Sequence, residues 1–95
     1  MDEFNKNDKQ VYFAQIKGSL IEANLGDRFC NITLSVGHEN AREVNLIMKR
    51  TDYDKLITDA DIVMHDKILC RYYLSSKKKH DRWYTNATVL DVVKN

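Results

Sequence analysis

The sequence predicts an all-β protein: a five-stranded barrel with one short helix, in the order β-β-β-α-β-β. Two observations support this prediction. Apolar and polar residues alternate in several short segments, as they do in strands that bury one face. One stretch after residue 50 instead spaces its apolar residues as a helix does, and polar turns separate the segments.

The first two strands are predicted to form a hairpin. Residues 11–23 alternate loosely, and the turn that follows contains Gly26, which tolerates unusual backbone angles. From Phe29 to Val36 the alternation is unbroken, because every second residue from Cys30 onward is apolar. We therefore expect one face of this second strand to be buried and the other exposed.

A third strand and the helix follow. Val44, Leu46 and Met48 predict the strand. Thr51 precedes acidic residues, which is typical of a helix start with a hydroxyl cap and carboxylates in the first turn. Apolar residues then fall at helical spacing at Tyr53, Leu56, Ile57 and Ala60. A helix of about ten residues is not stable alone, so we expect it to cover one end of the barrel.

The last two strands flank the most polar part of the chain. Every second residue from Ile68 to Leu74 is apolar, which predicts strand four, and residues 83–93 predict strand five. Strict alternation breaks after Val89, which indicates either a bulge or a strand end that is covered on both faces. The polar run that includes residues 77–79 predicts a loop between these strands, because adjacent lysines do not pack into a core.

Three strands, a helix and two strands are the order of the Greek-key OB-fold. We expect a single OB-fold domain over residues 11–95, preceded by a polar tail at residues 1–10. Ligands of such barrels usually lie across strands two and three, between the loop joining strands one and two and the loop joining strands four and five. The lysine-rich segment is predicted to be the second of these loops.

Strand alternation turns aromatic, amide and cationic side chains outward over this region. Cations of this kind neutralise phosphates, and rings stack on bases. The candidate nucleic-acid-binding residues are Lys17, Phe29, Asn31, Lys49, Arg71, Tyr73, Lys77, Lys78, Lys79, Arg82, Trp83 and Tyr84. Two alternatives remain open: the barrel is a protein-interaction module whose exposed rings cover a subunit contact, or Trp83 belongs to the core.

Three segments resemble strands of the bacterial single-stranded DNA-binding protein family, which includes compact members of the primosomal replication protein B type. They are Ile16-Lys17-Gly18-Ser19-Leu20, Phe29-Cys30-Asn31-Ile32-Thr33-Leu34-Ser35-Val36 and Arg82-Trp83-Tyr84-Thr85-Asn86-Ala87. The resemblance spans residues 11–93. It implies an OB-fold that binds single-stranded DNA in replication, repair or recombination, and that assembles as a homodimer or homotetramer. Because OB barrels also bind RNA, RNA stays open as an alternative partner. Where the family usually has a tryptophan in the third strand, this chain has Val44-Asn45-Leu46-Ile47, so one stacking ring is missing.

Composition and residue spacing bear on charge, enzyme activity, the state of the cysteines and cellular location. The net charge is only +1, but residues 67–82 contain six Lys or Arg against one acid, Asp81. His38, His65 and His80 fall in separate segments without a catalytic or metal-binding motif, so we expect no enzyme activity, cofactor or metal. Cys30 and Cys70 stand alone in apolar strands and are predicted to be reduced core residues. The polar start and the absence of a long apolar run predict a cytoplasmic protein without a membrane partner.

Overall fold

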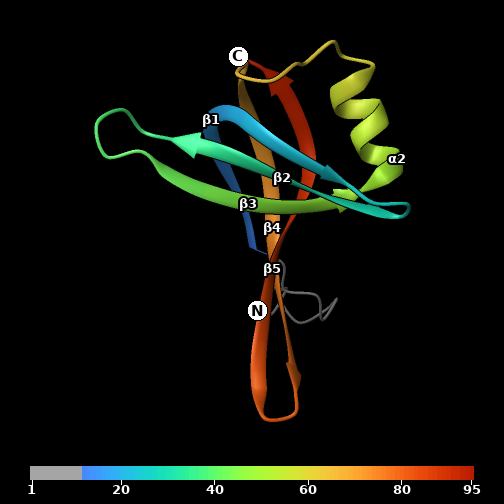
Figure 1. Cartoon of the computed structure of the whole chain (residues 1–95). Coiled ribbons are helices and arrows are strands. Elements are labelled where there is room, and N and C mark those ends of the chain that lie inside the picture. The colour runs from blue at the N-terminus through green and yellow to red at the C-terminus, as the bar shows by residue number, and fades with distance from the viewer. Residues whose placement is uncertain (1–11) are drawn as a thin grey trace, which may run out of the picture.

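Five strands close into a barrel in the order β1-β2-β3-β5-β4 (Figure 1). The structure is a computed structural model that describes residues 12–95; the predicted polar tail lies outside the described residues. The strands are β1 (Tyr12–Leu25), β2 (Phe29–Val36), β3 (Arg42–Lys49), β4 (Lys67–Lys79) and β5 (Arg82–Lys94). Neighbours are antiparallel except β3 and β5, which meet in parallel at Ile47 and Thr88. The predicted barrel and the predicted order of its elements are confirmed.

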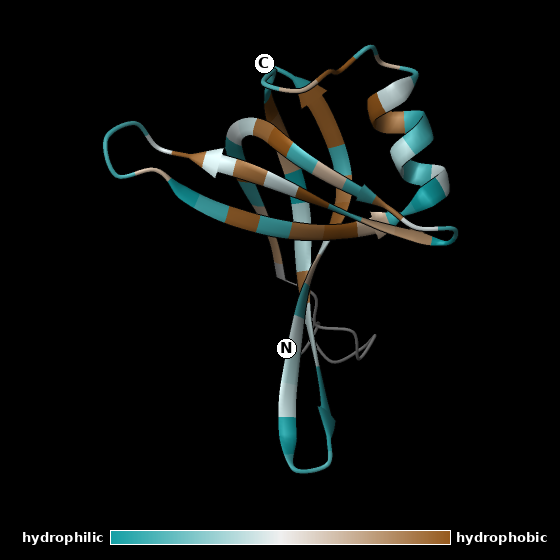
Figure 2. Ribbon diagram, viewed as in Figure 1, coloured by the Kyte–Doolittle hydropathy of each residue, from teal (hydrophilic) through white to brown (hydrophobic). Residues whose placement is uncertain are grey.

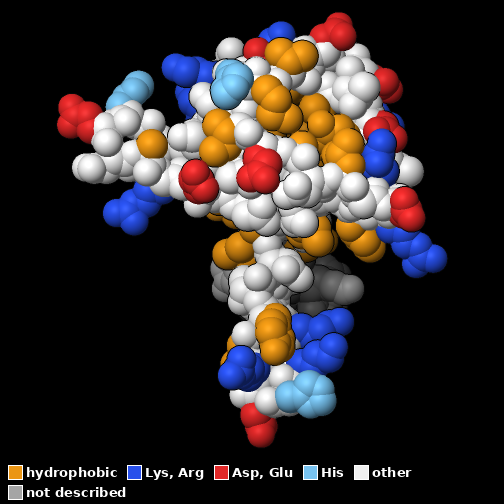
Figure 3. All heavy atoms as spheres, in the orientation of Figure 1, with side chains coloured by type: hydrophobic (Ala, Val, Ile, Leu, Met, Phe, Trp, Pro, Cys, Tyr) orange, Lys and Arg blue, Asp and Glu red, His pale blue; other side chains and the backbone are white. Residues whose placement is uncertain are grey.

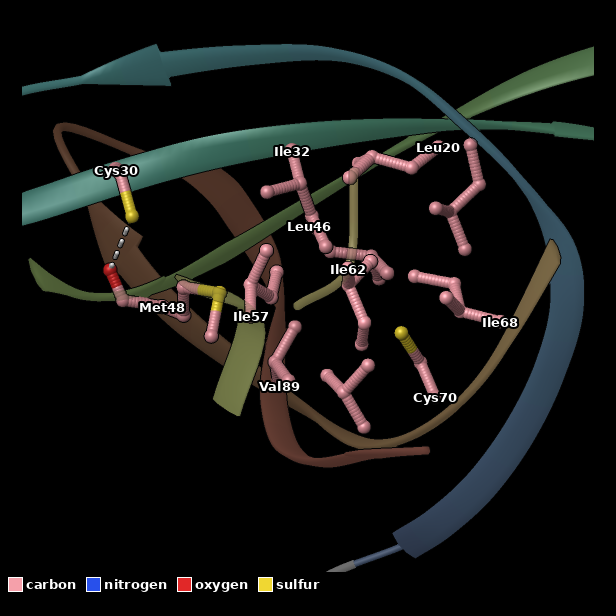
Figure 4. Close-up of a cluster of buried hydrophobic side chains, with 12 residues drawn as sticks. Leu20, Cys30, Ile32, Leu46, Met48, Ile57, Ile62, Ile68, Cys70 and Val89 are labelled. Carbon is pink, nitrogen blue, oxygen red and sulfur yellow. Dashed lines mark hydrogen bonds between the residues drawn. The ribbon is translucent and has the colours of Figure 1, made fainter. Parts of the chain in front are cut away.

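The core consists of residues from all five strands together with Ile57 and Ile62 from the segment between β3 and β4 (Figure 4). Leu20, Ile32 and Ile68 have no exposed surface, and the two cysteines are buried and unpaired with each other. The Cys30 thiol donates to the backbone oxygen of Met48 across 3.8 Å. The prediction of reduced core cysteines is therefore confirmed.

The helix covers one end of the barrel as predicted, but it begins differently. It consists of α2 (Arg50–Tyr53) followed by a π-helical turn, η1 (Asp54–Thr58). The predicted hydroxyl cap at Thr51 is wrong, because the capping position is Lys49 and no side chain caps this end. The backbone of the loop between β1 and β2 takes that role: the Arg50 N–H donates to the Arg28 carbonyl at 2.8 Å.

The apolar face of the helix is also shorter than predicted. Ile57 is buried at 1% exposure, and Tyr53 and Leu56 pack partly against the core. Ala60 lies beyond η1 and is exposed. Ile62, only 5% exposed, follows in the next turn and completes the cover of the barrel end.

Of the two explanations for the broken alternation in β5, the structure shows the bulge. Arg71 pairs with Asp91 while the next residue, Tyr72, pairs with Val89, so Leu90 has no partner across the ladder. The extra residue changes which side chains face inward. Val89 is consequently buried, while Leu90 is exposed.

The predicted loop between β4 and β5 is wrong at Lys77, Lys78 and Lys79. These residues belong to β4, and the turn consists of His80 and Asp81 alone. Both turn residues have positive φ, 53° and 64°, as a two-residue type I′ hairpin requires. We call the twisted hairpin at residues 75–86 the arm; it projects from the barrel (Figure 1). Neither of its faces is buried, so the apolar alternation that reveals a strand is missing there (Figure 2).

Within residues 12–95, no helix is long and apolar enough to cross a membrane.

Candidate nucleic-acid interface

A groove of about 440 Å³ lies on the outside of the barrel. Its walls come from β2, β3, the start of the helix, β4 and β5. The lining residues are Phe29, Ile47, Met48, Lys49, Asp52, Tyr73, Asn86, Thr88, Val89 and Leu90. The groove therefore crosses the same strands that bind ligands in other OB-folds, and it includes three of the predicted residues: Phe29, Lys49 and Tyr73.

Strand register places the groove side chains in rows. Phe29 lies opposite Lys49, so a ring that is 54% exposed stands beside an exposed ammonium group. In the next row Ile47 neighbours Thr88, and Thr88 lies opposite Tyr73. Directly opposed residues in a sheet share a face and lie roughly 5 Å apart, so these side chains form one continuous surface.

The loop before Phe29 is held in place by Arg50. The Arg50 guanidinium donates to the Gly26 carbonyl at 3.3 Å and to the Asp54 carboxylate at 3.3 Å. Gly26 turns back so closely that a Cβ atom there would lie 2.7 Å from the Phe29 carbonyl oxygen. The loop and the first residue of β2 are thus fixed relative to the helix.

One face of the arm is aromatic and strongly cationic. Lys77 lies opposite Tyr84, and Lys79 lies opposite Arg82, so these four side chains share a face. Tyr84 is 50% exposed, and the three cations are exposed as well. Figure 3 shows the Lys and Arg side chains gathered on the arm.

This face is continuous with the groove. The register between β4 and β5 has no irregularity from Tyr72 to the turn. Tyr73 and Thr88, which line the groove, are therefore followed on the same face by Ser75 and Asn86 and then by Lys77 and Tyr84. We call this continuous surface, from Phe29 across the groove to the end of the arm, the binding face.

The opposite face of the arm carries the other two candidates that belong to the arm, Lys78 and Trp83. Lys78 lies opposite Trp83, whose side chain is 67% exposed. Ser76 and Thr85 share this face, since their hydroxyl oxygens are 2.8 Å apart. The alternative that Trp83 belongs to the core is excluded. Although Trp83 and Tyr84 are adjacent in sequence, their rings lie on opposite faces of the arm and do not form one stacking surface.

The structure separates two further candidates from the groove. Arg71 is exposed between Gln15 of β1 and Asp91 of β5. Lys17 lies farther along the seam between β1 and β4, where it lines a different pocket. Asn31 lies opposite the groove residue Ile47 and stays at the edge of the binding face.

Several residues of this surface were not among the sequence candidates. Asn86 and Thr88 follow Tyr84 at intervals of two, so strand alternation could have identified them. Leu90 enters the groove because of the bulge, and Asp52 enters from the helix, which strand alternation does not reveal. Phe13, 62% exposed and opposite Tyr73, extends the aromatic surface onto β1.

Cationic and aromatic side chains dominate this surface. Among the described residues, no group of three or more His, Cys, Asp or Glu side chains is placed to hold a metal ion.

Comparison with known proteins identifies the fold. No protein-family model and no curated protein matches the chain. Thirty solved chains are similar in structure. The N-terminal domain of the PriB protein from Thermoanaerobacter tencongensis, described as dimeric, superposes with a TM-score of 0.60 at 11% identity, over 87% of this chain and 94% of that one. A small single-stranded DNA-binding protein from Streptomyces coelicolor superposes with a TM-score of 0.53 at 11% identity, over 88% of this chain and 94% of that one.

Both structures come from the groups that the sequence segments resemble. The predicted OB-fold is confirmed, and the resemblance to single-stranded DNA-binding proteins holds at the level of the fold. The chain therefore has the five-stranded OB-fold that is found in single-stranded DNA-binding proteins.

Proposed function

We propose that this protein binds single-stranded DNA without strong sequence preference, along the binding face, and that it acts in the cytoplasm in replication, repair or recombination. Phe29, Tyr73 and Tyr84 are proposed to stack on bases. The cations proposed to contact phosphates are Lys49, Lys77, Lys79 and Arg82. Each stacked base contributes about 1 to 3 kcal/mol in such sites, whatever the base, because every base has a π face.

The continuity of the binding face supports this proposal most strongly. Exposed rings and cations follow one face from the groove into the arm without a register break. From Tyr73 to Lys79 the strand alone covers about 20 Å at the rise of an extended chain. A long, narrow and cationic surface fits a flexible polyanion better than it fits a small ligand. The single-stranded DNA-binding neighbour from Streptomyces coelicolor adds weight to this choice.

A second candidate function is a contact with another protein chain through the opposite face of the arm. Trp83 is 67% exposed and Leu74, on the same face, is 47% exposed. Exposed aromatic and aliphatic residues often mark protein interfaces. The dimeric PriB domain makes a second copy of this chain the first partner to test, and a homodimer or homotetramer remains part of the proposal.

The proposed function is tested by titrating a fluorescein-labelled oligothymidylate with the protein at several salt concentrations. We expect binding at low salt, with the logarithm of the affinity falling linearly with the logarithm of the salt concentration, because phosphate contacts release counterions. Unlabelled oligouridylate and duplex DNA serve as competitors. Absence of binding at low salt, or an affinity independent of salt, would contradict the proposal; stronger competition by oligouridylate would assign the site to RNA.

The second candidate is separated from the first by light scattering on the wild-type protein and a Trp83→Ala variant. Assembly lost in the variant with DNA binding retained would assign the Trp83 side of the arm to self-association. An unchanged molar mass would exclude that role.

A further inference from the structure

A second pocket, of about 270 Å³, lies on the outside of the barrel away from the groove. It is lined by Lys17, Gly18, Ser19, Ser35, Gly37, His38 and Lys67. None of these residues lines the groove, so the two sites have no lining residue in common. The lining of this pocket contains two ammonium groups, two hydroxyl groups and an imidazole, and it contains no carboxylate.

Strand register brings these groups together. Ser19 of β1 lies opposite Ser35 of β2 on one side and opposite Lys67 of β4 on the other. Lys17 precedes Ser19 by two residues and therefore shares its outward face. Two hydroxyls and two ammonium groups thus converge from three strands, each about 5 to 7 Å from Ser19 at its backbone.

β1 and β2 approach each other closely where Gly18 and Ser35 line the pocket. A Cβ atom at Gly18 would lie 2.6 Å from the Ser35 carbonyl oxygen, so only glycine lets the strands come this near. Gly37, with φ of 99°, then turns the chain so that His38 reaches the rim. The shape of the pocket follows from these two glycines.

The nearby carboxylates are directed elsewhere. Asp66 precedes Lys67, but its carboxylate accepts from the Val63 N–H at 2.9 Å and pairs with Lys94 at 3.4 Å. Glu43, opposite Ser35, lines a separate hollow beside Arg42. Within residues 12–95, neither Lys17 nor Lys67 forms an ion pair. The positive charge of the pocket is thus not neutralised by the described carboxylates.

A row of outward residues joins this pocket to the binding face; Arg71 is its cation, and Asp91 of β5 lies opposite Arg71. Outward residues of the β1–β4 seam run from Phe13 and Tyr73 past Gln15 and Arg71 to Lys17. From Tyr73 to Lys67 the seam is about 20 Å long at the rise of an extended strand. A single-stranded nucleic acid that leaves the groove over Tyr73 and follows this seam would therefore pass Arg71 first and reach the pocket next.

We infer that this pocket binds a phosphate group of the same nucleic-acid strand, beyond the part held by the groove and the arm. The ammonium groups of Lys17 and Lys67 neutralise the phosphate, and the Ser19 and Ser35 hydroxyls donate to its oxygens. This inference rests on the proposed function and adds a second anchor to it, which only a strand of sufficient length reaches.

The test compares oligothymidylates of about 6 and about 20 nucleotides, lengths near and beyond the range that OB-folds occupy. We expect the double substitution Lys17→Ala/Lys67→Ala to leave the affinity for the short strand unchanged and to lower that for the long strand about tenfold at low salt. For the long strand, the slope of log affinity against log salt should become shallower by about 0.7, the value for the loss of one phosphate contact on a single strand. Lys55→Ala, an exposed lysine of the helix outside both sites, is the control for general charge.

Amide resonances give a second readout. The Ser19, Ser35 and Gly37 amides should shift when the long strand is added and should not shift with the short strand. Equal effects of the double substitution on both lengths, or no effect on either, would overturn the inference while leaving the proposed function intact. Shifts with inorganic phosphate but none with the long strand would assign the pocket to a free anion and overturn it too. Failure of both strands to bind the wild-type protein would overturn the proposed function and the inference together.

Discussion

Lys77 lies directly opposite Tyr84 across the β4–β5 ladder, whereas Trp83, the residue before Tyr84, lies opposite Lys78 on the other face of the arm. Each ring thus has a lysine beside it, but only the Tyr84 pair is continuous with the groove. This division predicts different consequences for the two aromatic residues.

Tyr84→Ala is expected to weaken binding of single-stranded DNA by about tenfold, because one stacked base is worth about 1 to 3 kcal/mol. Trp83→Ala should change the affinity much less. Both side chains are at least half exposed, so the free energy of unfolding should move by less than about 0.5 kcal/mol in either variant. Fluorescence titration measures the affinity, and thermal melts measure stability. A larger loss of DNA affinity in Trp83→Ala than in Tyr84→Ala would mean that DNA binds the opposite face of the arm.

Replacing Lys77 and Lys79 together with alanine should lower the affinity for all sequences alike. The slope of log affinity against log salt should become shallower by about 1.4, corresponding to two phosphate contacts on a single strand. The matched control is Lys78→Ala, which removes a neighbouring lysine from the opposite face and should change the slope little. Equal slopes in wild type and the double variant would place the phosphates elsewhere.

Arg50→Ala is expected to reduce the affinity for DNA, although the Arg50 side chain does not line the groove. Loss of the bonds to the Gly26 carbonyl and the Asp54 carboxylate releases the loop before Phe29 from the helix. Asp54→Asn weakens the ion pair but leaves the bond to Gly26, so it should have a smaller effect. Affinity measured for both variants, with backbone amide exchange of residues 26–28, decides whether the loop is the cause.

Ile57→Ala should destabilise the protein by about 2 to 5 kcal/mol, the usual cost of truncating a fully buried aliphatic side chain. Ile57 is 1% exposed and joins the helix to the barrel core. The exposed neighbour Ala60 provides the control, since Ala60→Ser should change stability by less than about 0.5 kcal/mol. Urea unfolding of both variants measures the difference.

Stability should fall as the solution becomes alkaline, in part because of Cys70. Burial, with a smaller contribution from Asp91, raises the pKa of this thiol from 9.0 to about 12. The folded protein thus favours the protonated thiol of Cys70. The contribution of this thiol to the free energy of unfolding is complete below pH 9 and is lost as the pH rises toward 12. One such group contributes at most about 1.4 kcal/mol per pH unit.

Urea unfolding of the wild type and Cys70→Ala between pH 8 and about 10.5 isolates this contribution. The wild-type free energy of unfolding should decline more steeply than that of the variant above pH 9. Parallel curves would mean that the thiol does not titrate differently in the folded and unfolded chains.

The sequence was most informative wherever one face of a strand is buried. Alternation in β2 identified Cys30 and Ile32 as core residues, and the break after Val89 located the irregularity that the structure shows to be a bulge. It was least informative in the arm. There both faces meet water, so Lys77 is as compatible with a strand as with a loop, and the pattern could not distinguish them.

The sequence by itself thus determined the barrel, the place of the helix and the chemistry of the exposed residues, because burial imposes a period on the residues that form a core. Only the tertiary structure decided which exposed residues share a surface. Cross-strand register makes Tyr84 continuous with the groove and places Trp83 on the opposite face, and it brings Lys17 and Lys67 into one pocket. Register is set by the turn geometry and by the buried pattern of both paired strands, and a strand such as the arm, with no buried face, does not specify it alone.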